Sequence, residues 1–195
     1  PDPDIELALN RTLAEMEQAV LRGDVEAYLA HIWTEDVTFR VEQLRWAQDW
    51  ADHPLSTFDL SLSALNAPEG ATEARGRLTI TWTQRDQDSS GGATLSVVFI
   101  RDGDRWRYGG EDWQVIDLDG ARLYYFSGPL LDNRVEAETL AEDLPDIFAR
   151  LKVVLDIAPA ETLKVRLYES APTLQTVTRL SMPNITTWNR PGEAI

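Results

Sequence analysis

The first 53 residues place apolar side chains at the spacing of amphipathic helices. In the first segment one stripe of period 3.6 holds Ile5, Leu9, Leu13, Met16 and Val20. Gly23 is a typical helix stop, and Asp24 is a typical cap for a following helix. The pattern predicts three helices, with a short strand between the second and the third, over residues 4–22, 24–32, 36–40 (the strand) and 42–51.

From residue 57 the apolar positions alternate with polar ones, which is the period of a half-buried strand. The alternation predicts four antiparallel strands over residues 57–65, 78–82, 94–101 and 105–116. The segment 102–104, Asp-Gly-Asp, predicts a tight hairpin turn between the last two strands.

A pair of glycines, Gly109 and Gly110, interrupts the last of these strands and indicates a β-bulge or a close backbone approach. A bulge shifts the side-chain register by one residue. It would therefore turn both Trp106 and Trp113 toward the core, on the face that Trp82 shares with its apolar neighbours.

A second pattern starts near residue 118. It predicts a strand, a long helix with Pro145 inside it, a second strand, a short helix and the start of a hairpin, over residues 121–126, 133–156, 162–168, 172–180 and 185–195. The sequence thus predicts an α+β fold in two parts: a domain over 1–117 and a small, incomplete α/β segment over 118–195.

The net charge and the cysteine count limit the kinds of partner and binding site that we expect. Eighteen basic and 33 acidic side chains give a net charge of −15, which argues against nucleic acid as a partner. No run of apolar residues is long enough for a membrane span. The chain has no cysteine and only two histidines, His31 and His53, 22 positions apart, so we expect no metal site and no cofactor.

The order of elements in 4–117 resembles the NTF2-like superfamily, also called SnoaL-like or cystatin-like. Two segments carry the resemblance. The first is residues 28–33 (YLAHIW) followed by residues 35–39 (EDVTF). The second is residues 103–113, which begin Gly-Asp-Arg-Trp-Arg and end Asp-Trp. The resemblance implies a curved sheet that wraps a long helix into a cone. In relatives the cone holds a small apolar ligand, an active site or only side chains, and the outer sheet face often forms a homodimer.

Residues 120–195 resemble the opening of a gluzincin, or peptidase MA-like, domain. The long helix, the segment 163–170 (LKVRLYES) and the expected hairpin at 188–195 carry this resemblance. It implies a bacterial, extracytoplasmic parent protein whose metal-binding His-Glu-x-x-His helix comes later in the chain. We therefore expect 118–195 to be a truncated subdomain with a downstream partner domain and without zinc ligands.

If the cone is an active site, its candidate catalytic residues are Tyr28, His31, Asp59 and Asp112. NTF2-like isomerases and dehydratases use an Asp or His base with Tyr or Asp donors in an apolar pocket. Each candidate also has a structural interpretation, as a core tyrosine, a helix-end histidine or a solvated carboxylate. Five tryptophans either fill the core or line a ligand pocket: Trp33, Trp46, Trp50, Trp82 and Trp113.

Two functional hypotheses follow from these residues. The first is a non-catalytic accessory or binding fragment of a larger metallopeptidase-like protein. The second is a small-molecule enzyme of the isomerase, dehydratase or cyclase type. An open cone with an inward carboxylate or histidine favours the enzyme, and a cone filled by side chains favours the accessory role.

Overall fold

The computed structural model describes residues 1–85, 90–127, 132–155, 162–191 and 193. The chain divides into two compact units. Residues 1–112 and 170–186 form the first unit, and residues 113–169 and 187–195 form the second. This division differs from the expected boundary at residue 117, because the chain returns to the first unit after residue 169.

Three helices open the first unit: α1 (Pro3–Arg22), α2 (Val25–Leu29) and α3 (Val37–Asp52). The expected stop and cap are confirmed, because Gly23 has a left-handed backbone (φ 70°) and the Asp24 carboxylate accepts a hydrogen bond from the Ala27 amide. The expected strand at 36–40 is wrong. Asp36 caps α3 by accepting hydrogen bonds from the amides of Thr38 and Phe39, and this cap outweighs the strand preference of Val37 and Thr38.

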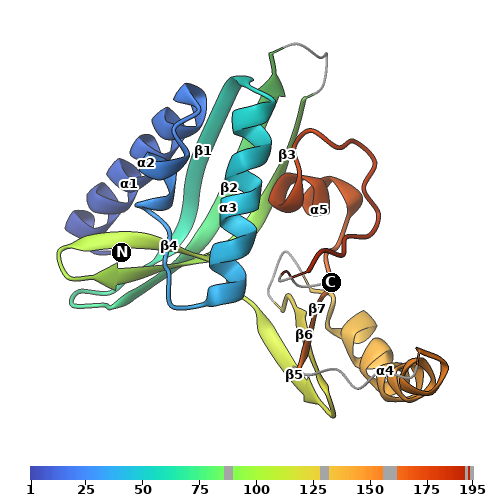
Figure 1. The fold of residues 1–195 in the computed structure, drawn as a ribbon. Coiled ribbons are helices and arrows are strands. Elements are labelled where there is room, and N and C mark those ends of the chain that lie inside the picture. The colour runs from blue at the N-terminus through green and yellow to red at the C-terminus, as the bar shows by residue number, and fades with distance from the viewer. Residues whose placement is uncertain (86–89, 128–131, 156–161, 192, 194–195) are drawn as a thin grey trace. The chain divides into compact units, whose positions relative to one another are not determined.

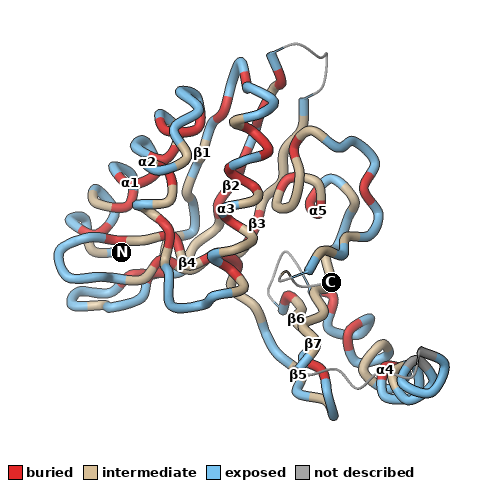
Figure 2. The backbone as a smooth tube through the Cα atoms, viewed as in Figure 1, coloured by how far each residue is buried: buried red, intermediate tan, exposed pale blue. Residues whose placement is uncertain are grey.

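Four long strands form a twisted antiparallel sheet in the order in which they occur in the chain (Figure 1). They are β1 (Leu55–Asn66), β2 (Glu73–Gln84), β3 (Ser90–Asp102) and β4 (Arg105–Glu111). The expected turn is confirmed, since Asp102 pairs with Arg105 across a two-residue loop in which Gly103 has a φ of 61°. The buried residues of the sheet include Phe58, Leu78, Trp82, Leu95, Val97, Phe99 and Trp106. Figure 2 shows the buried parts of the chain in red.

The bulge expected at the glycine pair is present in β4. Val97 of β3 pairs with Glu111, while Phe99 pairs with Tyr108, so β4 has one residue more than β3 over this stretch. Gly110 takes a φ of 94°, and a Cβ atom there would lie 2.8 Å from the Phe39 ring. The position therefore requires glycine both for its backbone and for the space next to Phe39.

The expected strand 105–116 is two strands in two different sheets. β4 ends at Glu111, and β5 (Gln114–Leu118) starts in the second unit. The expectation that Trp113 joins the core with Trp82 and Trp106 is therefore wrong for Trp113. The other two are buried in the first unit.

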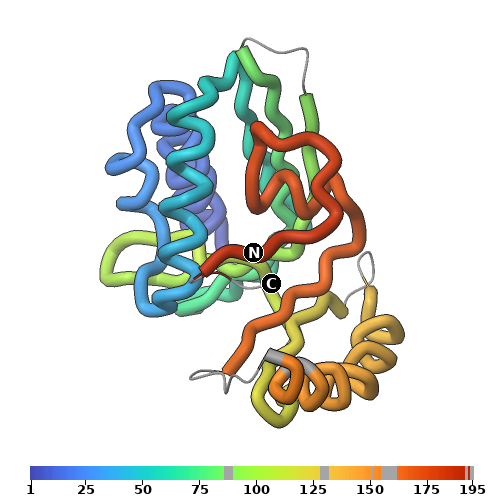
Figure 3. Tube along the Cα trace, turned by 45° about the vertical axis from the view of Figure 1, so that its right-hand side comes forward, coloured from blue at the N-terminus to red at the C-terminus, as the bar shows by residue number. Residues whose placement is uncertain are grey.

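The last helix of the chain, α5 (Ala171–Thr178), belongs to the first unit and packs on β3 (Figures 1 and 3). Ser170 caps it by accepting a hydrogen bond from the Thr173 amide, and a proline follows in its first turn. The sequence predicts this helix but gives no sign that it packs on a sheet formed some 70 residues earlier.

The second unit is a small α/β structure. Strands β5 and β6 (Ala121–Tyr125) form an antiparallel hairpin, α4 (Arg134–Leu155) follows, and β7 (Leu163–Arg166) pairs parallel to β6. Helix α4 continues through Pro145 and packs on the sheet through a core of Leu123, Ala137 and Leu144. The hairpin expected at 185–195 does not form over the described residues 185–191 and 193; positions 192, 194 and 195 lie outside the description.

The α+β class is confirmed. The first unit packs its helices against one four-stranded antiparallel sheet.

Candidate functional site

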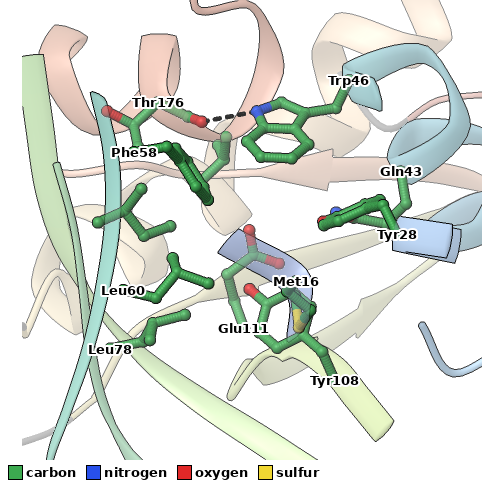
Figure 4. A pocket seen from close by; sticks show the side chains of 12 residues that line it. Met16, Tyr28, Gln43, Trp46, Phe58, Leu60, Leu78, Tyr108, Glu111 and Thr176 are labelled. Carbon is green, nitrogen blue, oxygen red and sulfur yellow. Dashed lines mark hydrogen bonds between the residues drawn. The ribbon is translucent and has the colours of Figure 1, made fainter. Parts of the chain in front are cut away.

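The first unit has a cavity of about 30 Å³ between its helices and the inner face of its sheet (Figure 4). This is enough room for a water molecule. Its wall is mainly apolar and aromatic and comes from α1, α2, α3, β1, β2, β4 and α5: Met16, Tyr28, Gln43, Trp46, Phe58, Leu60, Leu78, Ile80, Tyr108, Glu111, Thr176 and Val177.

Glu111 is the acidic residue of this wall. Only 9% of its surface is exposed, and Figure 4 shows its carboxylate among apolar and aromatic side chains. The bulge explains this orientation, because a regular strand would place Tyr108 and Glu111 on opposite faces, whereas the extra residue lets both face inward. Among the described residues none forms a hydrogen bond or an ion pair with this carboxylate.

Tyr28 enters the cavity from α2. Its hydroxyl donates a 2.6 Å hydrogen bond to Oε1 of Gln43, and its ring lies 5.3 Å from that of Trp46 and 5.7 Å from that of Trp50, between centroids. Burial raises the pKa of the Tyr28 hydroxyl, and the negative charge of Glu111 raises it further. The hydroxyl is therefore protonated at neutral pH and serves as a hydrogen-bond donor.

Trp46 connects the cavity to α5. Its indole Nε1 donates a 2.9 Å hydrogen bond to the backbone oxygen of Thr176, and Thr176 and Val177 both line the cavity. Helix α5 thus contributes one wall of the space that the other elements enclose.

A buried carboxylate on α3 holds the chain that follows α5. The Asp49 side chain is fully buried and accepts hydrogen bonds from the Ser181 amide at 3.0 Å and the Ser181 hydroxyl at 2.5 Å. The Arg179 guanidinium lies 3.3 Å from the same carboxylate. These contacts fix residues 179–181 one helical turn beyond Trp46.

The structure brings one of the four candidate catalytic residues, Tyr28, into the cavity. His31 is half-buried at the end of α2 and lies 3.6 Å from Glu15, and burial lowers its pKa. Asp59 is exposed on β1, and Asp112 pairs with Arg75 at 3.3 Å. None of these three lines the cavity.

Of the five tryptophans considered as pocket residues, Trp46 lines the cavity. Trp50 is buried behind Trp46 and Tyr28, and Trp82 is buried in the sheet core. Trp33 is half-buried in the connection after α2. Trp113 lies in the second unit, where its ring stacks on Phe126 at a centroid distance of 4.2 Å.

Sequence reasoning missed Glu111, Gln43, Tyr108 and the two residues of α5. The glycine pair was a usable signal for Glu111, because a bulge there changes which side chains of the strand face inward, although Asp112 was the candidate carboxylate. No signal in the sequence pointed to Thr176 and Val177.

Within the described parts of the chain, no group of three or more His, Cys, Asp or Glu side chains is placed to hold a metal ion. Over the same residues, no helix is both long and apolar enough to cross a membrane.

Three solved structures are similar to this chain, each over 53% of its length. An NTF-2 like protein of unknown function from Shewanella oneidensis is 14% identical, with a TM-score of 0.44 and 93% of its own chain covered. A protein of unknown function from Mycobacterium tuberculosis is 15% identical (TM-score 0.42, 66% covered). A scytalone dehydratase candidate from Novosphingobium aromaticivorans is 13% identical (TM-score 0.41, 79% covered).

No protein-family model matches the chain, and no curated protein matches its sequence. The comparisons give no support to the resemblance of residues 120–195 to peptidase MA-like domains.

Proposed function

We propose that the first unit is a binding module that holds a small, largely apolar molecule in its cone. The enclosed cavity carries this proposal, because apolar and aromatic walls with a few polar groups are typical of small-molecule sites. The aromatic rings of Tyr28, Trp46, Phe58 and Tyr108 offer apolar contact to such a molecule, and Glu111 offers a group that orients it.

We infer that the cavity must widen to hold a ligand. The free volume of about 30 Å³ is too small for an organic ligand of several heavy atoms. Helix α5 is held to α3 by the Trp46–Thr176 hydrogen bond and the contacts of Asp49, and it also packs on β3.

An enzyme of the isomerase or dehydratase type is the alternative, and one observation favours it. A buried carboxylate that faces an apolar cavity, next to a protonated tyrosine, is an arrangement suited to general-base catalysis. In this alternative Glu111 removes a proton from a carbon next to a carbonyl group. The Tyr28 hydroxyl would then have to exchange Gln43 for the substrate oxygen.

The binding proposal is tested with 1-aminoanthracene, a neutral aromatic fluorophore whose emission rises in apolar sites. We expect saturable binding to the full chain and loss of binding in Met16→Phe, which fills the cavity. Leu7→Phe on the exposed face of the same helix is the matched control, because Leu7 is 63% exposed. Equal fluorescence of the two variants would contradict the proposal.

The catalytic alternative is tested with a cyclic β,γ-unsaturated ketone. Its conversion to the conjugated isomer raises the ultraviolet absorbance, so turnover is measured directly. Turnover by the wild type that disappears in Glu111→Gln would favour the enzyme over the binding module.

A homodimer and a peptidase-like parent protein stay predictions, and no contact in the structure bears on them.

A further inference from the structure

We propose that the molecule bound in the cone carries a positively charged amine, and that Glu111 and the aromatic wall recognise this ammonium group. The inference rests on the proposed function and specifies its ligand. It starts from Glu111, which is only 9% exposed and whose carboxylate faces the cavity.

A buried carboxylate is costly unless a cation or several hydrogen-bond donors compensate it. No arginine, lysine or histidine is part of the cavity wall, and within the described residues nothing donates to the Glu111 oxygens. The protein therefore leaves this charge for another molecule to neutralise. An ammonium group does so with both charge and N–H donors.

The walls around Glu111 favour the same chemistry. The rings of Tyr28, Trp46 and Phe58 surround the cavity, and aromatic faces attract organic cations. Two donors of the wall are already used by protein acceptors, because the Tyr28 hydroxyl binds Gln43 and the Trp46 indole binds Thr176. An anionic ligand would be repelled by the Glu111 carboxylate, and these two donors would not be free to bind it.

The charge of the whole chain acts in the same direction. A net charge of −15 raises the local concentration of small cations around the protein and lowers that of anions. This long-range effect does not depend on any one residue, whereas the proposed recognition does, and the experiment separates the two.

The test compares benzylamine, benzyl alcohol and benzoate by calorimetric titration of the full chain at neutral pH. These probes share one ring and differ in the charge of a single substituent. We expect benzylamine to bind about tenfold or more tightly than benzyl alcohol, and benzoate to bind weakest. Glu111→Gln should remove the preference for benzylamine over benzyl alcohol.

Glu69→Gln is the matched control, since it removes the same charge from an exposed loop. Equal affinity of the wild type for benzylamine and benzyl alcohol would overturn the ammonium proposal and leave the binding module intact. An equal loss in Glu69→Gln and Glu111→Gln would also overturn it, because the preference would then come from the overall charge. If none of the probes binds, and 1-aminoanthracene does not bind, the proposed function itself fails. Equal wild-type affinities for benzylamine and benzyl alcohol overturn the proposal even where Glu111→Gln does not fold.

Discussion

Trp46 and Thr176 lie 130 positions apart in the chain, and the indole of the first donates a 2.9 Å hydrogen bond to the backbone oxygen of the second. This bond joins α3, which belongs to the opening helical layer, to α5, which comes near the end of the sequence. Both residues line the cavity that Glu111 also lines.

Trp46→Phe keeps an aromatic ring in the wall and removes this hydrogen bond. We expect a loss of about 1 kcal/mol in the free energy of unfolding, because the Thr176 oxygen loses a buried donor. Hydrogen exchange of residues 171–178 should accelerate more than that of α1. Trp33→Phe, at a half-buried tryptophan outside the cavity, should leave the exchange of α5 unchanged.

Asp49→Asn tests the anchor of residues 179–181. The substitution removes the buried negative charge that faces Arg179 and the hydroxyl of Ser181. We expect a loss of about 2 kcal/mol, measured by urea unfolding, since hydrogen bonds to charged groups are the stronger kind. Asp52→Asn, at an exposed position on the same helix, is the control, and an equal effect of both substitutions would contradict the anchoring role.

Gly110→Ala tests the bulge that orients Glu111. The φ of 94° and the contact of 2.8 Å between an added Cβ and the Phe39 ring both oppose a side chain here. We expect a cost above about 1 kcal/mol. Gly103→Ala separates the two causes, because Gly103 has a φ of 61° and no atom within 4 Å of an added Cβ. The variant at Gly110 should lose more stability and should also lose benzylamine affinity.

The stability of the chain should decrease, through His31, as the pH falls below the ordinary histidine pKa of 6.5. Burial lowers the pKa of His31 in the folded state below its ordinary value of 6.5. The unfolded chain therefore binds the proton more readily, and the contribution of the neutral side chain is lost as the pH falls below 6.5 toward the folded-state pKa. His31→Gln should flatten this part of the profile in urea titrations, and a profile parallel to the wild type would contradict the assignment.

A fragment that ends at residue 118 tests whether the first domain folds without the rest of the chain. We expect a cooperative melt, because all three opening helices and all four long strands are retained. The midpoint should lie below that of the full chain, since the fragment lacks α5 and exposes Trp46. A broad, non-cooperative melt would show that residues 170–186 are required for folding.

The sequence by itself determined the local elements wherever one signal was dominant. The stripe from Ile5 to Val20 predicted α1, the alternation from residue 57 predicted the strands, and the two glycines predicted the bulge. These features depend on backbone conformation and on neighbours a few residues away. The strand expected at 36–40 does not form, because Asp36 caps α3 and this local effect outweighs the strand preference of Val37 and Thr38.

Tertiary structure alone decided which residues share the site. Glu111, rather than Asp112, faces the cavity because the bulge shifts the register by one residue, and β4 then ends before Trp113 can join the same core. Thr176 and Val177 reach the cavity because the chain leaves the first unit at residue 113 and returns at residue 170. Hydrophobic periodicity records which face of an element is buried, but not which distant element covers it, so this wall of the site could not be predicted from the sequence.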